Sequence, residues 1–205
     1  MKDENLGIWE RIEAARARCN VLEHPFYQRW SAGELSSDEL ARYSGQYRHA
    51  VEGVASLSAA VAEAIPERPE LRSHAVEEAA HVELWDGFVD AVGGSADAEP
   101  TPETRECLEA WTRADGLLPN LARLYAIESG QPEISRTKRD GLINRYGARD
   151  GSGTAYFRVH ETRDVEHAAQ TRELISELSG RADEDAIVAA AESAFRANWR
   201  LLDGV

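Results

Sequence analysis

The sequence predicts an all-α protein, with one domain that spans residues 1–205 and folds as a bundle of seven to eight helices. Helix-forming residues, above all Ala, Leu, Glu and Arg, are abundant along the chain. Apolar residues recur at spacings of three and four, which is the period of an amphipathic helix. The alternating β-branched and aromatic runs that are typical of strands are nearly absent. A length of 205 residues suits a single domain with a sizeable core.

Turn and cap residues divide the chain into helices of ordinary length. A Ser-Ser-Asp-Glu segment at residues 36–39 predicts a capped helix start. His24-Pro25 and Gly93-Gly94 predict breaks, and residues 147–153 predict a turn. Between these signals, the expected helices cover residues 6–21, 36–64, 71–92, 103–114, 117–129, 132–146, 154–178 and 183–202.

Charge and composition exclude several classes of partner. The formal net charge of −14 repels phosphates and anionic headgroups, so neither nucleic acid nor a membrane surface is expected. No stretch approaches the ~20 apolar residues that span a bilayer. The N-terminal segment, MKDENLGIWERIEAA, is charged and amphipathic, unlike a signal peptide. Two cysteines, Cys19 and Cys107, fit the reduced thiols of a cytosolic protein, so a cytoplasmic location is expected.

The strongest chemical signal lies in residues 156–167. His160, Asp164 and His167 stand at positions i, i+4 and i+7, which share one face of a helix. Two imidazoles and one carboxylate on one face suit iron, manganese or zinc. A solvated helix face that happens to carry histidines would show the same spacing. This segment alone therefore leaves both interpretations open.

A second segment strengthens the metal interpretation. Glu78-x-x-His81 places a carboxylate and an imidazole at i and i+3, the pair that dicarboxylate metal bundles project into their cores. His74 and Glu77 lie on the same face, up to two turns earlier. Glutamate-rich surface helices are common, so this pair supports a metal site only in combination with the motif at residues 160–167.

Glu128 supplies the third element of the prediction. It lies within an apolar stripe that includes Leu121 and Leu124. A carboxylate that faces a core is costly unless it is paired or bound to a cation. A surface position beside the stripe is the alternative. If all three segments meet, three histidines and three carboxylates form the inventory for two metal ions.

These residues, in this order, resemble those of the haem-oxygenase-like diiron oxidases, a helical-bundle superfamily that also holds TenA-like and pyrroloquinoline-quinone-synthase-like proteins. The resemblance extends from His24 to about Leu178, and H-x-x-x-D-x-x-H is its most specific motif. It implies a haem-oxygenase-like bundle in which two irons cycle between Fe2+ and Fe3+ and activate O2, with electrons from a reductant. Manganese is the alternative metal, and a homodimer is the expected assembly. The implied ligands are Glu78, His81, Glu128, His160, Asp164 and His167.

Local matches point to one branch of this superfamily, which includes the chlamydial death-domain-associating protein and makes the folate precursor 4-aminobenzoate. The resemblance to that branch implies that Tyr27 supplies the aromatic ring of the product. It also implies Lys138 as the amine donor and Tyr43 as a second candidate tyrosine. Each of the three has an ordinary interpretation, as a core aromatic residue or a solvated lysine. The matching segments are His24-Pro-Phe-Tyr27-Gln-Arg-Trp, Tyr43-x-x-x-Tyr47, His81-Val-Glu-Leu-Trp85 and residues 128–142.

One position departs from the pattern of that branch. The branch has a metal-binding carboxylate seven residues before the equivalent of His81, where this sequence has His74. Other members of the superfamily use the carboxylate three residues before, which is Glu78 here. We predict Glu78 as the ligand, with Glu77 and His74 as alternatives. A ligating His74 would make the site richer in imidazole than usual.

Two other functions stay open at this point. The first is a diiron oxidase or decarboxylase of an external small molecule, such as a fatty acid or an amino acid. Its apolar cavity would be lined by residues such as Trp30, Tyr43, Tyr47 and Phe157. The second is a helical partner-binding protein or a cofactor-free TenA-like enzyme. TenA-like enzymes rely on a cysteine nucleophile, and neither Cys19 nor Cys107 lies in a segment that resembles that site.

Overall fold

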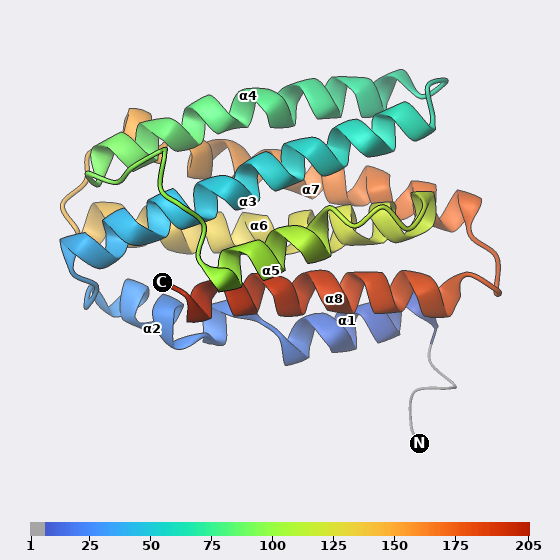
Figure 1. Ribbon diagram of the computed structural model, residues 1–205, viewed down its shortest axis with the longest axis horizontal. Coiled ribbons are helices and arrows are strands. Elements are labelled where there is room, and N and C mark those ends of the chain that lie inside the picture. The colour runs from blue at the N-terminus through green and yellow to red at the C-terminus, as the bar shows by residue number, and fades with distance from the viewer. Residues whose placement is uncertain (1–6) are drawn as a thin grey trace.

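The computed structural model describes residues 7–205, which form eight α-helices and one short 3-10 helix, η1 (Figure 1). No strand occurs in this part of the chain, which confirms the all-α fold class. No helix among the described residues has the length and apolarity needed to cross a bilayer. Leu6, where the first helix was expected to begin, lies outside the described residues. The elements are α1 Ile8–Arg18, η1 Val21–Glu23, α2 Pro25–Ala32, α3 Ser37–Ala64, α4 Pro69–Ala91, α5 Pro102–Trp111, α6 Leu117–Asn144, α7 Ser152–Leu178 and α8 Glu184–Asp203.

Four long helices enclose the centre of the molecule. α3 packs on α4, α4 on α7, α7 on α6, and α6 on α3, so the four form a closed ring (Figure 1). α8 packs against α6, and α1 and α5 pack against α8. The ring interior is lined from four sides and is shielded from water. Any side chain that points into it must be apolar, paired or bound to a ligand.

Local sequence explains where most helices begin. At α3, the Ser36 hydroxyl accepts a hydrogen bond from the Glu39 amide, and the Glu39 carboxylate accepts one from the Ser36 amide, which is the predicted cap. Pro25 opens α2 at its first position, so it starts a short helix that was not expected. Gly33 ends α2 with φ of 77°, a conformation that favours glycine.

The prediction of two helices over residues 117–129 and 132–146 is wrong, because α6 runs unbroken through Pro132. A proline inside a helix costs roughly 3 kcal/mol and weakens the hydrogen bonds of the preceding turn. Here α6 is held along its length by α7 and α8. The Arg16 guanidinium also donates a hydrogen bond to the Ser129 carbonyl oxygen in that turn, at 3.3 Å. Packing therefore overrides the local signal.

Two other boundaries were predicted too far along the chain. The first helix ends at Arg18 and not at Val21, which belongs to η1. The helix expected over residues 103–114 ends at Trp111. The last turn of a helix often frays, and its end depends on cap geometry. No single residue in these two stretches predicts that geometry.

Candidate metal centre

Three helices of the ring project a set of buried histidines and carboxylates into its interior. We call this set the His–carboxylate cluster. Each member exposes at most 5 % of its surface. All six predicted ligands belong to it, together with His74, which was only an alternative. Its members are His74, Glu78 and His81 on α4, Glu128 on α6, and His160, Asp164 and His167 on α7.

The two helices that face each other carry the same pattern. On α7, His160, Asp164 and His167 follow the spacing H-x-x-x-acid-x-x-H, and on α4 His74, Glu78 and His81 repeat it. Each triplet occupies one helix face, and α4 packs directly on α7. This repeat is a sequence signal that places His74 beside the predicted ligands.

Two groups of candidate ligands meet at one carboxylate. The first group contains His74, Glu78, Glu128 and His167, and the second contains Glu78, His81 and His160; within each group the donor atoms lie within 4.8 Å of one another. Glu78 belongs to both groups and is the carboxylate that they share.

Short distances connect the members of the two groups. His74 Nε2 lies 2.7 Å from Glu128 Oε1, and His81 Nδ1 lies 3.2 Å from Glu78 Oε1. Asp164 lies outside both groups, with Oδ1 3.8 Å from His167 Nδ1. The donors on α4, α6 and α7 are thus close enough to share ions between helices.

The polar atoms that meet inside the cluster make no hydrogen bond of good geometry, although His74 approaches Glu128 and His81 approaches Glu78. Buried polar groups are nearly always paired, because an unpaired one costs roughly 1–3 kcal/mol. Imidazole nitrogens and carboxylate oxygens suit iron or manganese, so the donor set fits a metal centre better than a self-sufficient polar core. The unpaired atoms are His74 Nε2, Glu78 Oε1, His81 Nδ1, His160 Nε2, His167 Nδ1 and both carboxylate oxygens of Glu128 and Asp164.

Burial shifts the pKa values of the carboxylates and histidines in the cluster. It raises the pKa of Glu128 and of Asp164 well above their usual values, and neighbouring carboxylates add to the effect. Burial alone would also raise the pKa of Glu78, but His81 and the other nearby imidazoles lower it. Burial lowers the pKa of His160 and of His167 to about 4. The two imidazoles are therefore neutral at pH 7, with a lone pair available for a metal.

A main-chain contact fixes the orientation of His160. Its Nδ1 donates a hydrogen bond to the Tyr156 carbonyl oxygen at 2.8 Å, so Nε2 faces the cluster. The Tyr156 ring stacks on the imidazole with centroids 3.8 Å apart. A second contact of this kind is what holds most metal-binding histidines in place.

A second buried group surrounds Lys138 of α6. Its Nζ is buried without a hydrogen-bond partner, and burial lowers the pKa of the amine well below its usual value. We call this group the aromatic–lysine cluster. The rings around the amine belong to Tyr27, Tyr43, Tyr47, Trp85 and Phe157, with centroids between 4.3 and 5.6 Å from Nζ.

The three predicted catalytic residues meet in the aromatic–lysine cluster. The hydroxyls of Tyr27 and Tyr43 lie 3.1 Å apart, and both rings are within reach of Lys138. Trp85 and Tyr156 connect this cluster to the histidines, with ring centroids 4.8 Å apart. Of the expected aromatic lining, Tyr43, Tyr47 and Phe157 pack around the amine. Trp30 is buried as well, but its Nε1 donates to the Lys138 carbonyl oxygen at 3.2 Å.

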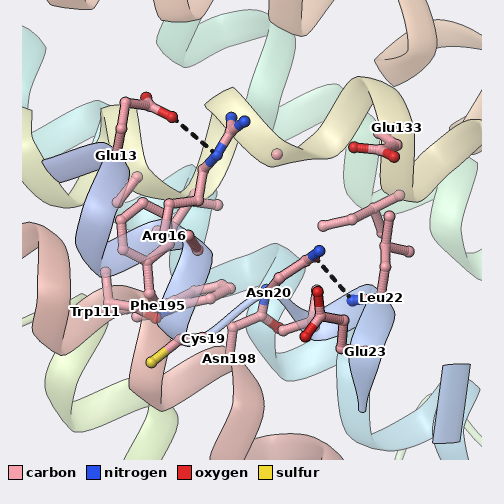
Figure 2. A pocket seen from close by; sticks show the side chains of 17 residues that line it. Glu13, Arg16, Cys19, Asn20, Leu22, Glu23, Trp111, Glu133, Phe195 and Asn198 are labelled. Carbon is pink, nitrogen blue, oxygen red and sulfur yellow. Dashed lines mark hydrogen bonds and ion pairs between the residues drawn. The ribbon is translucent and has the colours of Figure 1, made fainter. Parts of the chain in front are cut away.

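A separate cavity of about 250 Å³ lies between α1, α6 and α8 (Figure 2). The Glu13–Arg16 ion pair, at 3.2 Å, and Cys19 lie at its edge. Its lining includes none of the predicted ligands or catalytic residues. Cys19 and Cys107 are both free thiols, and neither belongs to the His–carboxylate cluster.

Comparisons with known proteins agree with this geometry. A family model described as iron-containing redox enzyme matches residues 42–199. A protein of Chlamydia muridarum named 4-aminobenzoate synthase is 30% identical over 99% of this chain and 92% of its own length. A protein of Nitrosomonas europaea with the same name is 29% identical, over 96% of this chain and 89% of its own.

Solved structures reveal the same fold at low sequence identity. A TenA homologue from Pseudomonas syringae superposes with a TM-score of 0.82 at 19% identity, covering 96% of this chain and 89% of its own. A domain with a haem-oxygenase-like fold from Shewanella denitrificans gives a TM-score of 0.80 at 18% identity, covering 98% of this chain and 92% of its own. These likenesses concern the fold alone, and they confirm the haem-oxygenase-like architecture.

Proposed function

Since the chain belongs to the family of iron-containing redox enzymes, we propose that it holds two iron ions in the His–carboxylate cluster and forms 4-aminobenzoate from its own Tyr27. The relatives named 4-aminobenzoate synthase, similar over nearly the full chain, support the product. The single observation that carries the proposal is the fully buried, unpaired Lys138 amine among tyrosine rings beside this cluster.

The proposed metal ligands are the six predicted residues with His74 added. When bound, two Fe2+ ions would supply the electrons that reduce O2, the proposed co-substrate. Glu78 would help to hold both ions, because it belongs to both ligand groups. The three carboxylates of the cluster would leave one positive charge with two Fe2+ ions, and neutral imidazoles complete the coordination. The apolar residues of the ring exclude bulk water from this centre.

Tyr27 and Lys138 would be consumed in the proposed reaction. The Tyr27 hydroxyl is held by Tyr43, at 3.1 Å, which orients the ring that would become the product. Burial lowers the pKa of the Lys138 amine well below its usual value, which favours the neutral form whose lone pair can act as a nucleophile. Its Nζ lies 5.6 Å from the Tyr27 ring centroid. Burial raises the pKa of Tyr27 well above its usual value, so the phenol stays protonated until it is oxidised.

A genetic test measures the proposed product directly. The gene should restore growth, without added 4-aminobenzoate, to a strain that lacks the usual genes for this compound. Tyr27→Phe and Lys138→Ala should each abolish rescue. Tyr125→Phe is the matched control, because the Tyr125 hydroxyl contacts Glu13 and lies outside the aromatic–lysine cluster. Rescue that survives both changes would refute consumption of the protein's own side chains.

Intact mass spectrometry separates this proposal from oxidation of an external molecule. After iron(II) loading and exposure to O2, a protein that consumes Tyr27 changes mass once and then stops. An oxidase of an external fatty acid or amino acid would turn over repeatedly, with Tyr27 intact. An unchanged mass after product has formed would therefore favour the external substrate.

A further inference from the structure

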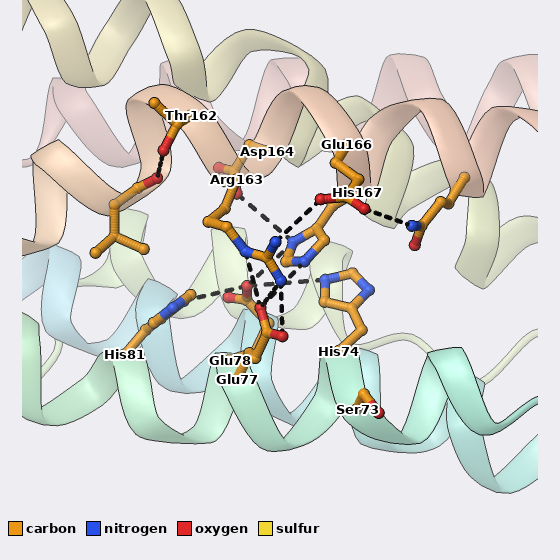
Figure 3. Close-up of polar contacts among 12 residues, drawn as sticks. Ser73, His74, Glu77, Glu78, His81, Thr162, Arg163, Asp164, Glu166 and His167 are labelled. Atoms are coloured by element: carbon orange, nitrogen blue, oxygen red, sulfur yellow. Dashed lines mark hydrogen bonds and ion pairs between the residues drawn. The ribbon is translucent and has the colours of Figure 1, made fainter.

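Glu77 and Arg163 form a two-pronged ion pair at the edge of the His–carboxylate cluster. Arg163, on α7, reaches across to Glu77 on α4 (Figure 3). Its Nη2 donates to both carboxylate oxygens, at 2.8 and 2.7 Å, and its Nε donates to Oε2 at 3.2 Å. The Glu77 side chain is 36% exposed, unlike the buried ligands around it. The pair therefore lies at the surface and connects the two helices that supply most of the cluster.

Glu77 also lies against one of the predicted ligands. Its Oε2 is 3.4 Å from His167 Nε2. On the other side of that ring, Nδ1 is unpaired and lies 3.8 Å from Glu78 Oε1. The imidazole is thus placed between an outer carboxylate and the inner donors. Metal-binding histidines usually donate their second N–H to such an outer group, which fixes the tautomer and the ring orientation.

The other α7 histidine provides a useful contrast. His160 is oriented by the Tyr156 carbonyl, a main-chain group on its own helix. For His167, the outer group in reach is a glutamate on another helix, which Arg163 holds in place. The orientation of His167 would then depend on two side chains that can be changed without altering the backbone.

We propose that Glu77 is a positioning residue that fixes His167 with Nδ1 toward the metal, and that Arg163 holds Glu77 outside the set of ligands. This inference rests on the proposed metal centre. It removes Glu77 from the candidate ligands and gives it a different role. It also explains how a glutamate next to Glu78 can lie at the site without entering it.

Metal affinity of four variants tests the proposal, with Co2+ titrated into the metal-free protein. Glu77→Ala should weaken one of two binding steps by about ten- to a hundredfold, the usual loss for an outer partner of a ligand. Glu77→Gln should recover part of that loss, because its amide oxygen still accepts from Nε2. Arg163→Met should weaken the same step. Glu166→Gln is the control, since Glu166 contacts Arg163 at 3.0 Å but does not reach His167, and it should change nothing.

Arg163→Met distinguishes a positioning residue from a ligand. If Glu77 were a ligand restrained by the ion pair, releasing it would tighten binding, and Glu77→Ala would remove one ion altogether. Either result, or unchanged affinity in Glu77→Ala, would overturn the proposal. Failure of the unaltered protein to bind two ions would instead refute the proposed metal centre.

A second readout does not need the metal. Nitrogen-15 NMR of the metal-free protein should show His167 as the Nε2–H tautomer, and Glu77→Ala should lose that preference. A wild-type His167 that carries its proton on Nδ1 would overturn the proposal independently of any ion.

Discussion

The His–carboxylate cluster and the aromatic–lysine cluster lie in the same ring of helices, yet they differ in the number and surroundings of their buried polar groups. In the first, α4, α6 and α7 bring together many imidazole nitrogens and carboxylate oxygens that make no hydrogen bond of good geometry. The second surrounds a single amine, Lys138, with aromatic rings. Unpaired donors in number indicate a site completed by cations. Burial of a lone amine among rings favours its neutral form, which is the form that our proposed function requires.

We expect the largest effect from a substitution that removes a metal ligand from the His–carboxylate cluster. His160→Ala removes an imidazole of the second ligand group, whose Nε2 faces Glu78 and His81. We expect iron bound after anaerobic loading to fall from two ions per chain to one or none. Product formation should fall by more than about a hundredfold, because loss of an outer partner alone costs ten- to a hundredfold. Metal analysis and product assays provide the two measurements.

His49→Gln is the control for that experiment. His49 lies on α3 and contacts the Ala98 carbonyl oxygen at 2.7 Å, outside the cluster. Full iron content and activity in His160→Ala would contradict the assignment of this histidine, whereas loss of iron in His49→Gln would point to a general effect on folding.

The next largest effect concerns the aromatic–lysine cluster, where one substitution should change product formation and folding stability in opposite directions. Lys138→Met keeps most of the unbranched side chain and removes a buried amine that has no partner. We expect product formation to be lost. The metal-free protein should nevertheless become more stable. Loss of the unpaired buried group contributes about 1–3 kcal/mol, and the deprotonation of the amine on folding adds about 1.4 kcal/mol for each pH unit below about 10.4. Urea denaturation measures the change, and a loss of stability would contradict a neutral, unpaired amine.

The stability gained in Lys138→Met should depend on pH. Burial lowers the pKa of Lys138 in the folded chain, while the unfolded chain binds a proton up to about pH 10.4. Wherever the folded amine is neutral, the unfolded wild type holds an extra proton, and wild-type stability rises with pH up to about pH 10.4. The advantage of Lys138→Met should shrink by about 1.4 kcal/mol per pH unit. Denaturation at pH 7.5 and 8.5 measures this slope, and a constant difference would mean that Lys138 is charged in the folded state.

The two regions also differ in how far the sequence predicted them. His160, Asp164 and His167 share a face as soon as α7 forms, so their proximity follows from spacing alone. Glu78 and His81 are brought to them by the packing of α4 on α7. A sequence pattern predicts such packing only when both helices carry the same spacing of histidines and carboxylates on one face. His74 completes that match, and its place in the first ligand group was resolved only by the fold.

Other features depended on tertiary structure that no local pattern encodes. Tyr27, Tyr43 and Lys138 come from three helices with no common spacing, so only resemblance to a family singled them out. Pro132 predicted a break that packing overrides. Glu77 and Glu78 are adjacent and chemically identical, but Arg163 holds one at the surface while the other turns inward.

Iron stoichiometry tests the central claim most directly. Metal-free protein is titrated with Fe2+ under strict exclusion of O2, and bound iron is counted per chain after removal of the excess. We expect two irons per chain. One iron or fewer would contradict a two-metal centre, however well the donors in the His–carboxylate cluster face one another.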